Sequence, residues 1–97
     1  MDAVFAGNDA IAYGVWKALQ ESGASIPDDV AVVGFDDREL CSLTSPNLTS
    51  VQTFNERVGR ECARVLLEKL KNPGRRMPQV KLPTSLVARG SSVRGLD

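Results

Sequence analysis

The chain has 97 residues, 42% hydrophobic and 25% charged, which fits one small globular unit and excludes two complete domains. No apolar run approaches the roughly 18 residues of a membrane span, so we expect no contact with a membrane. The absence of histidine excludes Ser-His-Asp and Cys-His catalysis and most catalytic zinc sites within these residues. The two cysteines, Cys41 and Cys62, form no CxxC motif, so neither a metal site nor a redox pair is predicted.

Charge is unevenly distributed along the chain, although the twelve basic and twelve acidic residues balance. Residues 1–50 hold eight acids and two bases, whereas residues 51–97 hold four acids and ten bases. The zero total argues against a general nucleic-acid surface. The first residues lack the charged and apolar regions of a secretory signal, so we expect a cytoplasmic protein.

The first half of the sequence predicts two strands on either side of a helix. A short apolar run predicts a strand over residues 3–6. A helix follows over residues 10–22 and stops at Gly23, because apolar side chains recur there at helical spacing: Ile11, Val15 and Leu19. Residues 30–35 are continuously apolar, which is typical of a strand covered on both faces, as in a parallel sheet.

The second half predicts a third strand, a long helix and an extended tail. Residues 38–46 are polar and irregular, with at most one helical turn, and residues 48–52 read as a strand. A helix runs from near Asn55 to the stop at residues 72–74, and the tail over residues 80–93 predicts one or two extended segments that finish near Arg89. This alternation predicts an α/β fold with a mainly parallel sheet. Two helices are too few to cover both faces, so we expect an incomplete sheet.

Polar residues follow each predicted parallel strand, at the edge where ligands bind in open α/β sheets. They are Asn8, Asp9, Asp36, Asp37, Gln52 and Thr53. An amide both donates and accepts hydrogen bonds and an ionised Asp accepts from two hydroxyls, a combination that suits a polyhydroxy ligand such as a sugar. Each residue also has a local structural interpretation, as a helix cap or a loop residue.

Other chemistries have little support in the sequence. The pair Asp36 and Asp37 could hold Mg²⁺, as in a receiver domain, but no later strand ends in a suitable Asp. Phosphate-binding glycine loops are absent, and Cys41 or Ser42 would lack a base as a nucleophile. We therefore expect no enzyme, no metal and no cofactor.

Two further groups of side chains bear on what covers the surfaces of the two predicted helices: a partner protein or the core on the first and solvent on the second. Tyr13 and Trp16 lie off the apolar stripe of their helix, which fits either an interface or the edge of the core. On the long helix, the basic residues have acids within i,i+4 reach, so a solvated salt-bridged face is favoured over a nucleic-acid surface. The expected pairs are Arg57 with Glu61 and Arg64 with Glu68.

Several ordered blocks resemble the C-terminal part of transcription regulators of the LacI/GalR (lactose-repressor/galactose-repressor) family. The blocks span nearly the whole chain: residues 5–14 (FAGNDAIAYG), 23–30 (GASIPDDV), 32–37 (VVGFDD), 48–51 (LTSV) and 86–93 (LVARGSSV). The resemblance implies a partial periplasmic-binding-protein-like (type I) α/β fold that straddles two subdomains. Residues 1–48 would lie mainly in the C-terminal subdomain. Residues 49–80 would form the crossover and a helix of the N-terminal subdomain, and residues 81–97 would be the tail that returns to the C-terminal subdomain. The resemblance also implies that these residues do not include the DNA-binding headpiece.

The same resemblance implies effector sensing, with a sugar-like small molecule in the cleft between the subdomains and allosteric control of operator binding. Positions matching Asn8 and Asp36 contact the effector in this family. The position matching Thr53 is commonly a Gln that faces the ligand, and here Gln52 lies beside it. The family pattern also implies a homodimer, with Tyr13 and Trp16 as contacts and Leu40 and Leu43 as weaker candidates, and DNA binding only through the headpiece. The alternatives are a periplasmic-type sugar-binding protein of a transporter and, less favoured, a flavodoxin-like enzyme.

Overall fold

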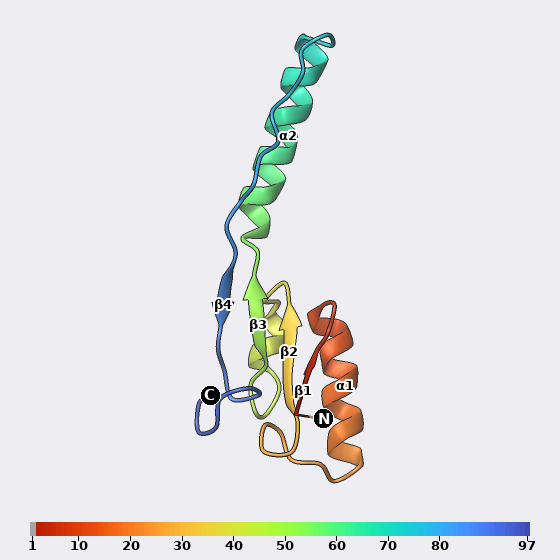
Figure 1. The fold of residues 1–97 in the computed structure, drawn as a ribbon, viewed down its shortest axis with the longest axis vertical. Coiled ribbons are helices and arrows are strands. Elements are labelled where there is room, and N and C mark those ends of the chain that lie inside the picture. Colours follow the sequence, from red (N-terminus) through yellow and green to blue (C-terminus); the bar gives the residue numbers. More distant parts are fainter. Residues whose placement is uncertain (1) are drawn as a thin grey trace.

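The computed structural model describes residues 2–97 (Figure 1). The elements follow in the order β1 (Ala3–Phe5), α1 (Asp9–Glu21), β2 (Ala31–Phe35), the 3-10 helix η1 (Glu39–Ser42), β3 (Thr49–Gln52), α2 (Asn55–Lys71) and β4 (Ser85–Val87). The α/β alternation is as predicted, and the first three strands and both long helices agree with their predicted bounds to within one residue. No helix in residues 2–97 is long and apolar enough to cross a membrane.

The four strands form one sheet in the order β1-β2-β3-β4. The first three are parallel, and β4 runs antiparallel to β3. Because β1, β2 and β3 are parallel, their carboxyl ends lie at one edge of the sheet, which the arrowheads of β2 and β3 mark in Figure 1.

Only one face of this sheet is covered within the described residues. α1 packs on β2, where Val32 and Gly34 are buried while the alternating residues are only half-buried. The expected incomplete sheet is therefore confirmed for residues 2–97, because the second long helix turns away from the sheet and leaves the other face of β2 uncovered. The core is accordingly small: Ala6, Ala12, Val32, Cys41 and Leu48.

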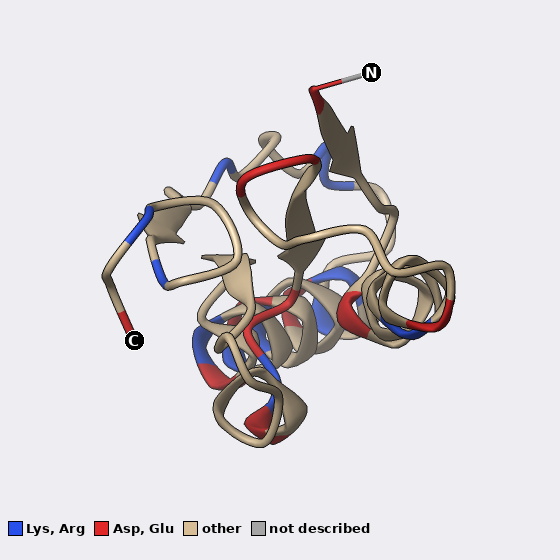
Figure 2. Ribbon diagram, turned by 90° about the horizontal axis from the view of Figure 1, so that it is seen from below, with Lys and Arg blue, Asp and Glu red and all other residues tan. Residues whose placement is uncertain are grey.

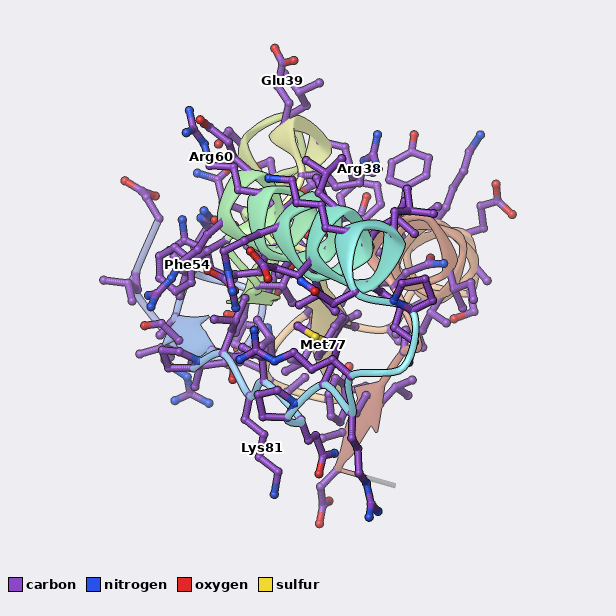
Figure 3. All side chains as sticks on the ribbon, turned by 90° about the horizontal axis from the view of Figure 1, so that it is seen from above. Arg38, Glu39, Phe54, Arg60, Met77 and Lys81 are labelled. Atoms are coloured by element: carbon purple, nitrogen blue, oxygen red, sulfur yellow. The ribbon has the colours of Figure 1, made fainter. Side chains whose placement is uncertain are left out.

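Residues 53–84 form a projection, which we call the arm, while residues 2–52 and 85–97 form the body. α2 and the segment that returns from it run side by side away from the sheet (Figure 1), and the molecule measures 58 × 21 × 20 Å. No residue of α2 is buried. An apolar groove separates α2 from the returning segment, and Figure 3 shows Met77 between the two.

Charges on α2 form local ion pairs, as expected, but with different partners. Arg60 pairs with Glu56 at 3.2 Å and Arg64 with Glu61 at 2.9 Å, both on exposed surface. The expected pairs Arg57–Glu61 and Arg64–Glu68 do not form, because Glu61 turns to Arg64 and Glu68 lies 3.5 Å from Arg75 of the returning segment. Figure 2 shows the basic and acidic residues in a view along the long axis, in which the body and the arm overlap.

Candidate ligand site at the strand ends

The predicted polar residues do lie at one edge of the sheet, where β1, β2 and β3 end. Phe5 pairs with Val33 and Phe35 with Val51, so the strands end nearly in step. The Asp36 amide donates to the Val51 carbonyl at 2.9 Å and extends the ladder by one residue. Asp36 thus stands next to Gln52, at the edge from which the arm leaves the body (Figure 1).

Asp36 combines a left-handed backbone with a carboxylate that has no partner within residues 2–97. Its φ is 103° and that of Asp37 is 54°, so two consecutive non-glycine residues occupy the left-handed region, which costs on the order of 1–3 kcal/mol per residue. The Asp36 side chain is half-buried, and within residues 2–97 its carboxylate accepts no hydrogen bond and forms no ion pair. All its lone pairs are therefore available to a ligand.

Asp37, in contrast, is committed to the structure. Its Oδ1 lies 2.7 Å from Nη2 of Arg89, and the two side chains are only 14% and 17% exposed. The same guanidinium donates through Nη1 to the Leu48 carbonyl at 2.8 Å. Asp37 thus connects the loop after β2 to the segment after β4, in agreement with its interpretation as a loop residue.

Asn8 caps α1 and has part of its hydrogen-bonding capacity left. The Ile11 amide donates to Asn8 Oδ1 at 2.8 Å, which satisfies a free amide in the first turn of the helix. This bond fixes the side chain and leaves its NH₂ group as a donor. Asn8 can therefore donate to a ligand oxygen at the half-buried edge of the site.

Gln52 and Thr53 differ in how free they are. Thr53 Oγ1 donates to Asn55 Oδ1 at 2.5 Å and so serves the start of α2 locally. Gln52 is half-buried at the end of β3, and its side-chain amide makes no hydrogen bond to residues 2–97. Of the two, Gln52 has the greater capacity to bind a ligand.

Two aromatic side chains that we did not predict also border this edge. Phe5 and Phe35 line a shallow hollow of about 290 Å³ together with Ala6 and Gly7. Phe5 is 69% exposed, although it is the last residue of a strand. Aromatic surface beside a few polar groups is typical of small-molecule sites. The sequence did show that both residues end a strand. It did not show that they border the same hollow, because that depends on how the strands are aligned in the sheet.

Asp9 was predicted as a possible cap and is instead fully buried. Its carboxylate accepts from the Ser50 hydroxyl and from the Arg38 amide, each at 2.6 Å. Cys41 lies nearby in the core: burial, followed by a hydrogen bond with Asp9, raises the pKa of this thiol to about 11. Asp9 therefore cannot touch a ligand at the edge and acts through its neighbours.

The predicted interface residues lie on two separate elements. Tyr13 and Trp16 stack in α1, with ring centroids 5.8 Å apart, and Tyr13 is 41% exposed. Leu43 is 76% exposed after η1, whereas Leu40 packs partly against the core. Tyr13 and Leu43 are the most available for contact with a partner.

The metal alternative gains no support from the geometry. Asp37 is neutralised by Arg89, so the two adjacent carboxylates do not form a shared acidic site. Across residues 2–97 there is no cluster of three or more side chains of the kind that could hold a metal ion.

Comparison with known proteins identifies the family. The sequence profile of the periplasmic binding protein-like domain matches residues 1–92. The ribose operon repressor of Escherichia coli strain K12 is 38% identical over 90 residues, which cover 93% of this chain and 27% of the repressor. The chain thus spans about a quarter of the length of such relatives.

Solved structures agree with this result. A complex of the transcriptional regulator CelR with cellobiose superposes with a TM-score of 0.88 at 37% identity, over 95% of this chain and 28% of CelR. A LacI family regulator from Enterococcus faecalis with bound ribose superposes with a TM-score of 0.84 at 34% identity, over 93% of this chain and 34% of the regulator. These relatives are transcription regulators. The chain belongs to the periplasmic-binding-protein-like domain family, as a partial effector domain of the LacI/GalR type.

Proposed function

We propose that this chain supplies one wall of an effector site in a transcription regulator and that the effector is a sugar. The observation that carries the proposal is the free carboxylate of Asp36, held at the carboxyl edge of the sheet by a left-handed backbone. The relatives with ribose and cellobiose support the sugar class.

The side chains at this edge divide the binding chemistry among them. Asp36 accepts hydrogen bonds from two neighbouring hydroxyls, Asn8 donates to a ring or hydroxyl oxygen, and Gln52 does either. Phe5 and Phe35 offer apolar surface to the C–H groups of a sugar ring. Together they bind a molecule whose surface alternates hydroxyls with C–H groups.

The body and the arm belong, in this proposal, to the two subdomains that enclose the effector. Residues 1–48 lie mainly in the C-terminal subdomain, residues 49–80 cross into the N-terminal one, and residues 81–97 return. An effector that binds the closed cleft more tightly than the open one shifts that equilibrium and thereby changes operator affinity. DNA is bound by a separate headpiece.

A chimera tests the sugar site. Residues 1–97 replace the matching part of the ribose-bound Enterococcus faecalis regulator, and pentoses, hexoses, disaccharides and nucleosides are titrated by calorimetry. We expect saturable binding of at least one sugar with one site per chain. A folded chimera that binds no sugar, while the parent regulator binds ribose, would contradict the proposal, as would binding of a nucleoside alone.

We also propose that the regulator is a homodimer in which Tyr13, Trp16 and Leu43 contact the partner, with Leu40 at the margin. The exposed ring of Tyr13 and the exposed Leu43 support this assignment. Light scattering on the chimera should give a dimer that weakens when Tyr13 and Leu43 are both replaced by Ser. An unchanged dimer would show that the contact lies elsewhere.

A further inference from the structure

The loop that carries Asp36 is held in place by two buried side chains. The Asp37 amide donates to Ser50 Oγ at 2.9 Å, and the Arg38 amide donates to Asp9 Oδ2 at 2.6 Å. The two amides directly after Asp36 are thus both held by side chains from other elements. This loop contains the two left-handed residues Asp36 and Asp37, whose geometry persists only when the surroundings enforce it.

The two side chains also bind each other, and in a defined direction. The Ser50 hydroxyl has one proton, which it donates to Asp9 Oδ1 at 2.6 Å. With the proton so placed, the lone pairs of Ser50 Oγ face the Asp37 amide. Asp9 lies in the first turn of α1, where the helix dipole stabilises a negative charge. The carboxylate therefore orients the hydroxyl, and the hydroxyl orients the loop.

We infer that Asp9 and Ser50 form a latch that positions the Asp36 carboxylate for the effector. This inference rests on the proposed sugar site. Both side chains are fully buried, so neither touches the ligand, and both are positioning residues. Their effect on binding passes through the amides of Asp37 and Arg38.

Ser91 provides a matched control for Ser50. It is also fully buried and also makes two hydrogen bonds, because it donates to the Val32 carbonyl and accepts from the Thr49 amide at 2.8 Å. Its partners lie within the strands β2 and β3 and not in the Asp36 loop. Loss of either hydroxyl should therefore cost similar stability, whereas only loss of Ser50 frees the loop.

The first measurement uses the 97-residue chain and needs no ligand. In ¹H–¹⁵N spectra, Ser50→Ala should move the Asp37 amide resonance upfield and speed its hydrogen exchange, and Ser91→Ala should leave it in place. Asp9→Asn is a second variant, because Asn has a single acceptor oxygen for the two donors and its NH₂ group cannot accept a hydrogen bond, and it should shift the Arg38 amide. If the Asp37 and Arg38 amides keep their wild-type resonances and exchange rates in both variants, the latch is refuted.

The second measurement is sugar affinity in the chimera. We expect Ser50→Ala to weaken binding roughly tenfold, Ser91→Ala to change it less than twofold, and Ser50→Thr to restore most of it because the hydroxyl is kept. Equal losses for Ser50→Ala and Ser91→Ala, or no loss for Ser50→Ala, would overturn the positioning role and leave the sugar site standing. A wild-type chimera without sugar binding would instead refute the proposed function, and the amide measurement would still decide whether the latch exists.

Discussion

Gly34 lies where α1 leaves no room for a side chain. A Cβ built at this position would overlap Asp9 Oδ1 and lie 3.3 Å from the Cβ of Ala12. The residue lets α1 approach β2 closely enough for the Asp9 carboxylate to reach Ser50 and Arg38. The glycine in β2 therefore serves the site as well as the packing.

Gly34→Ala should destabilise the chain by about 1–3 kcal/mol, because the added methyl group overpacks the contact with α1. Gly14→Ala is the matched control: its Cβ would meet no atom within 4 Å, and an alanine in a helix should stabilise by about 0.5–1 kcal/mol. Urea denaturation measures both. Equal stability of the two variants would show that the approach of α1 to β2 is looser than described.

The two cysteines should differ in reactivity and in their effect on stability at high pH. Burial raises the pKa of Cys41 to about 11 from 9.0, whereas Cys62 is exposed. Between pH 9 and pH 11 the Cys41 thiol keeps its proton in the folded chain but loses it in the unfolded chain. The free energy of unfolding should therefore fall as pH rises from about 9 to about 11. Well below pH 9 the Cys41 thiol is protonated in both states, so it does not make the free energy of unfolding depend on pH.

Urea denaturation at pH 8 and pH 10.5 checks this, with Cys41→Ala as the comparison because it removes the thiol. The wild-type chain should lose more stability over this interval than the variant. In the folded state a thiol reagent should label Cys62 only. Rapid labelling of Cys41 in the native chain would contradict its burial.

How far the site follows from sequence differs from residue to residue. Asp36 was predictable, because it directly follows an apolar strand and parallel strands place their ends at one edge. The burial of Asp9 was not, because it depends on the Asp9–Ser50 contact across 41 residues of sequence. Phe5 and Phe35 were missed for a related reason: only strand register shows that they border the same hollow.

At the scale of elements, α2 was predicted correctly in extent but not in its surroundings. Its apolar spacing and its stop at residues 72–74 set the bounds, since both are local properties. Its ion-pair partners depend on rotamers and on the returning segment, and so could not be derived from i,i+4 spacing alone. The apolar run of β2 does not reveal which of its faces this chain covers, whereas the small number of predicted helices did indicate that the coverage is incomplete.

Truncation of a leucine should therefore cost little in α2 and much in the body. Leu66 is 58% exposed and Leu48 is fully buried. Leu48→Ala should lower the free energy of unfolding by about 2–5 kcal/mol. Leu66→Ala should change it by less than about 1 kcal/mol, because the Leu66 side chain buries little apolar area when the chain folds. Denaturation of the 97-residue chain measures both variants. A comparable loss for Leu66→Ala would show that its face of α2 is covered in solution.

The whole molecule explains the charge asymmetry of the sequence. Residues 53–84, the arm, hold eight bases and three acids, whereas the first 50 residues are strongly acidic. The change of sign falls at β3 (Thr49–Gln52), after which the chain leaves the body. The neutral total thus combines an acidic body with a basic arm.

The arm should make the chain much larger in solution than a compact protein of its length. The radius of gyration is 17.7 Å, against about 13 Å for a compact domain of this size. Small-angle X-ray scattering, at a concentration where light scattering reports a monomer, should give a value close to 18 Å. A monomer near 13 Å would mean that the arm folds back onto the body.

The most direct test of the whole scheme is the sugar affinity of the chimera with Asp36→Ala. Loss of the charged acceptor should weaken binding by about 1.5–3 kcal/mol. Asp28→Ala is the control, because Asp28 also carries a charge but pairs with Arg94 on exposed surface in the loop before β2, at the opposite end of that strand from Asp36. A chimera whose affinity is unchanged by Asp36→Ala, or lowered equally by Asp28→Ala, would contradict the central role of the Asp36 carboxylate.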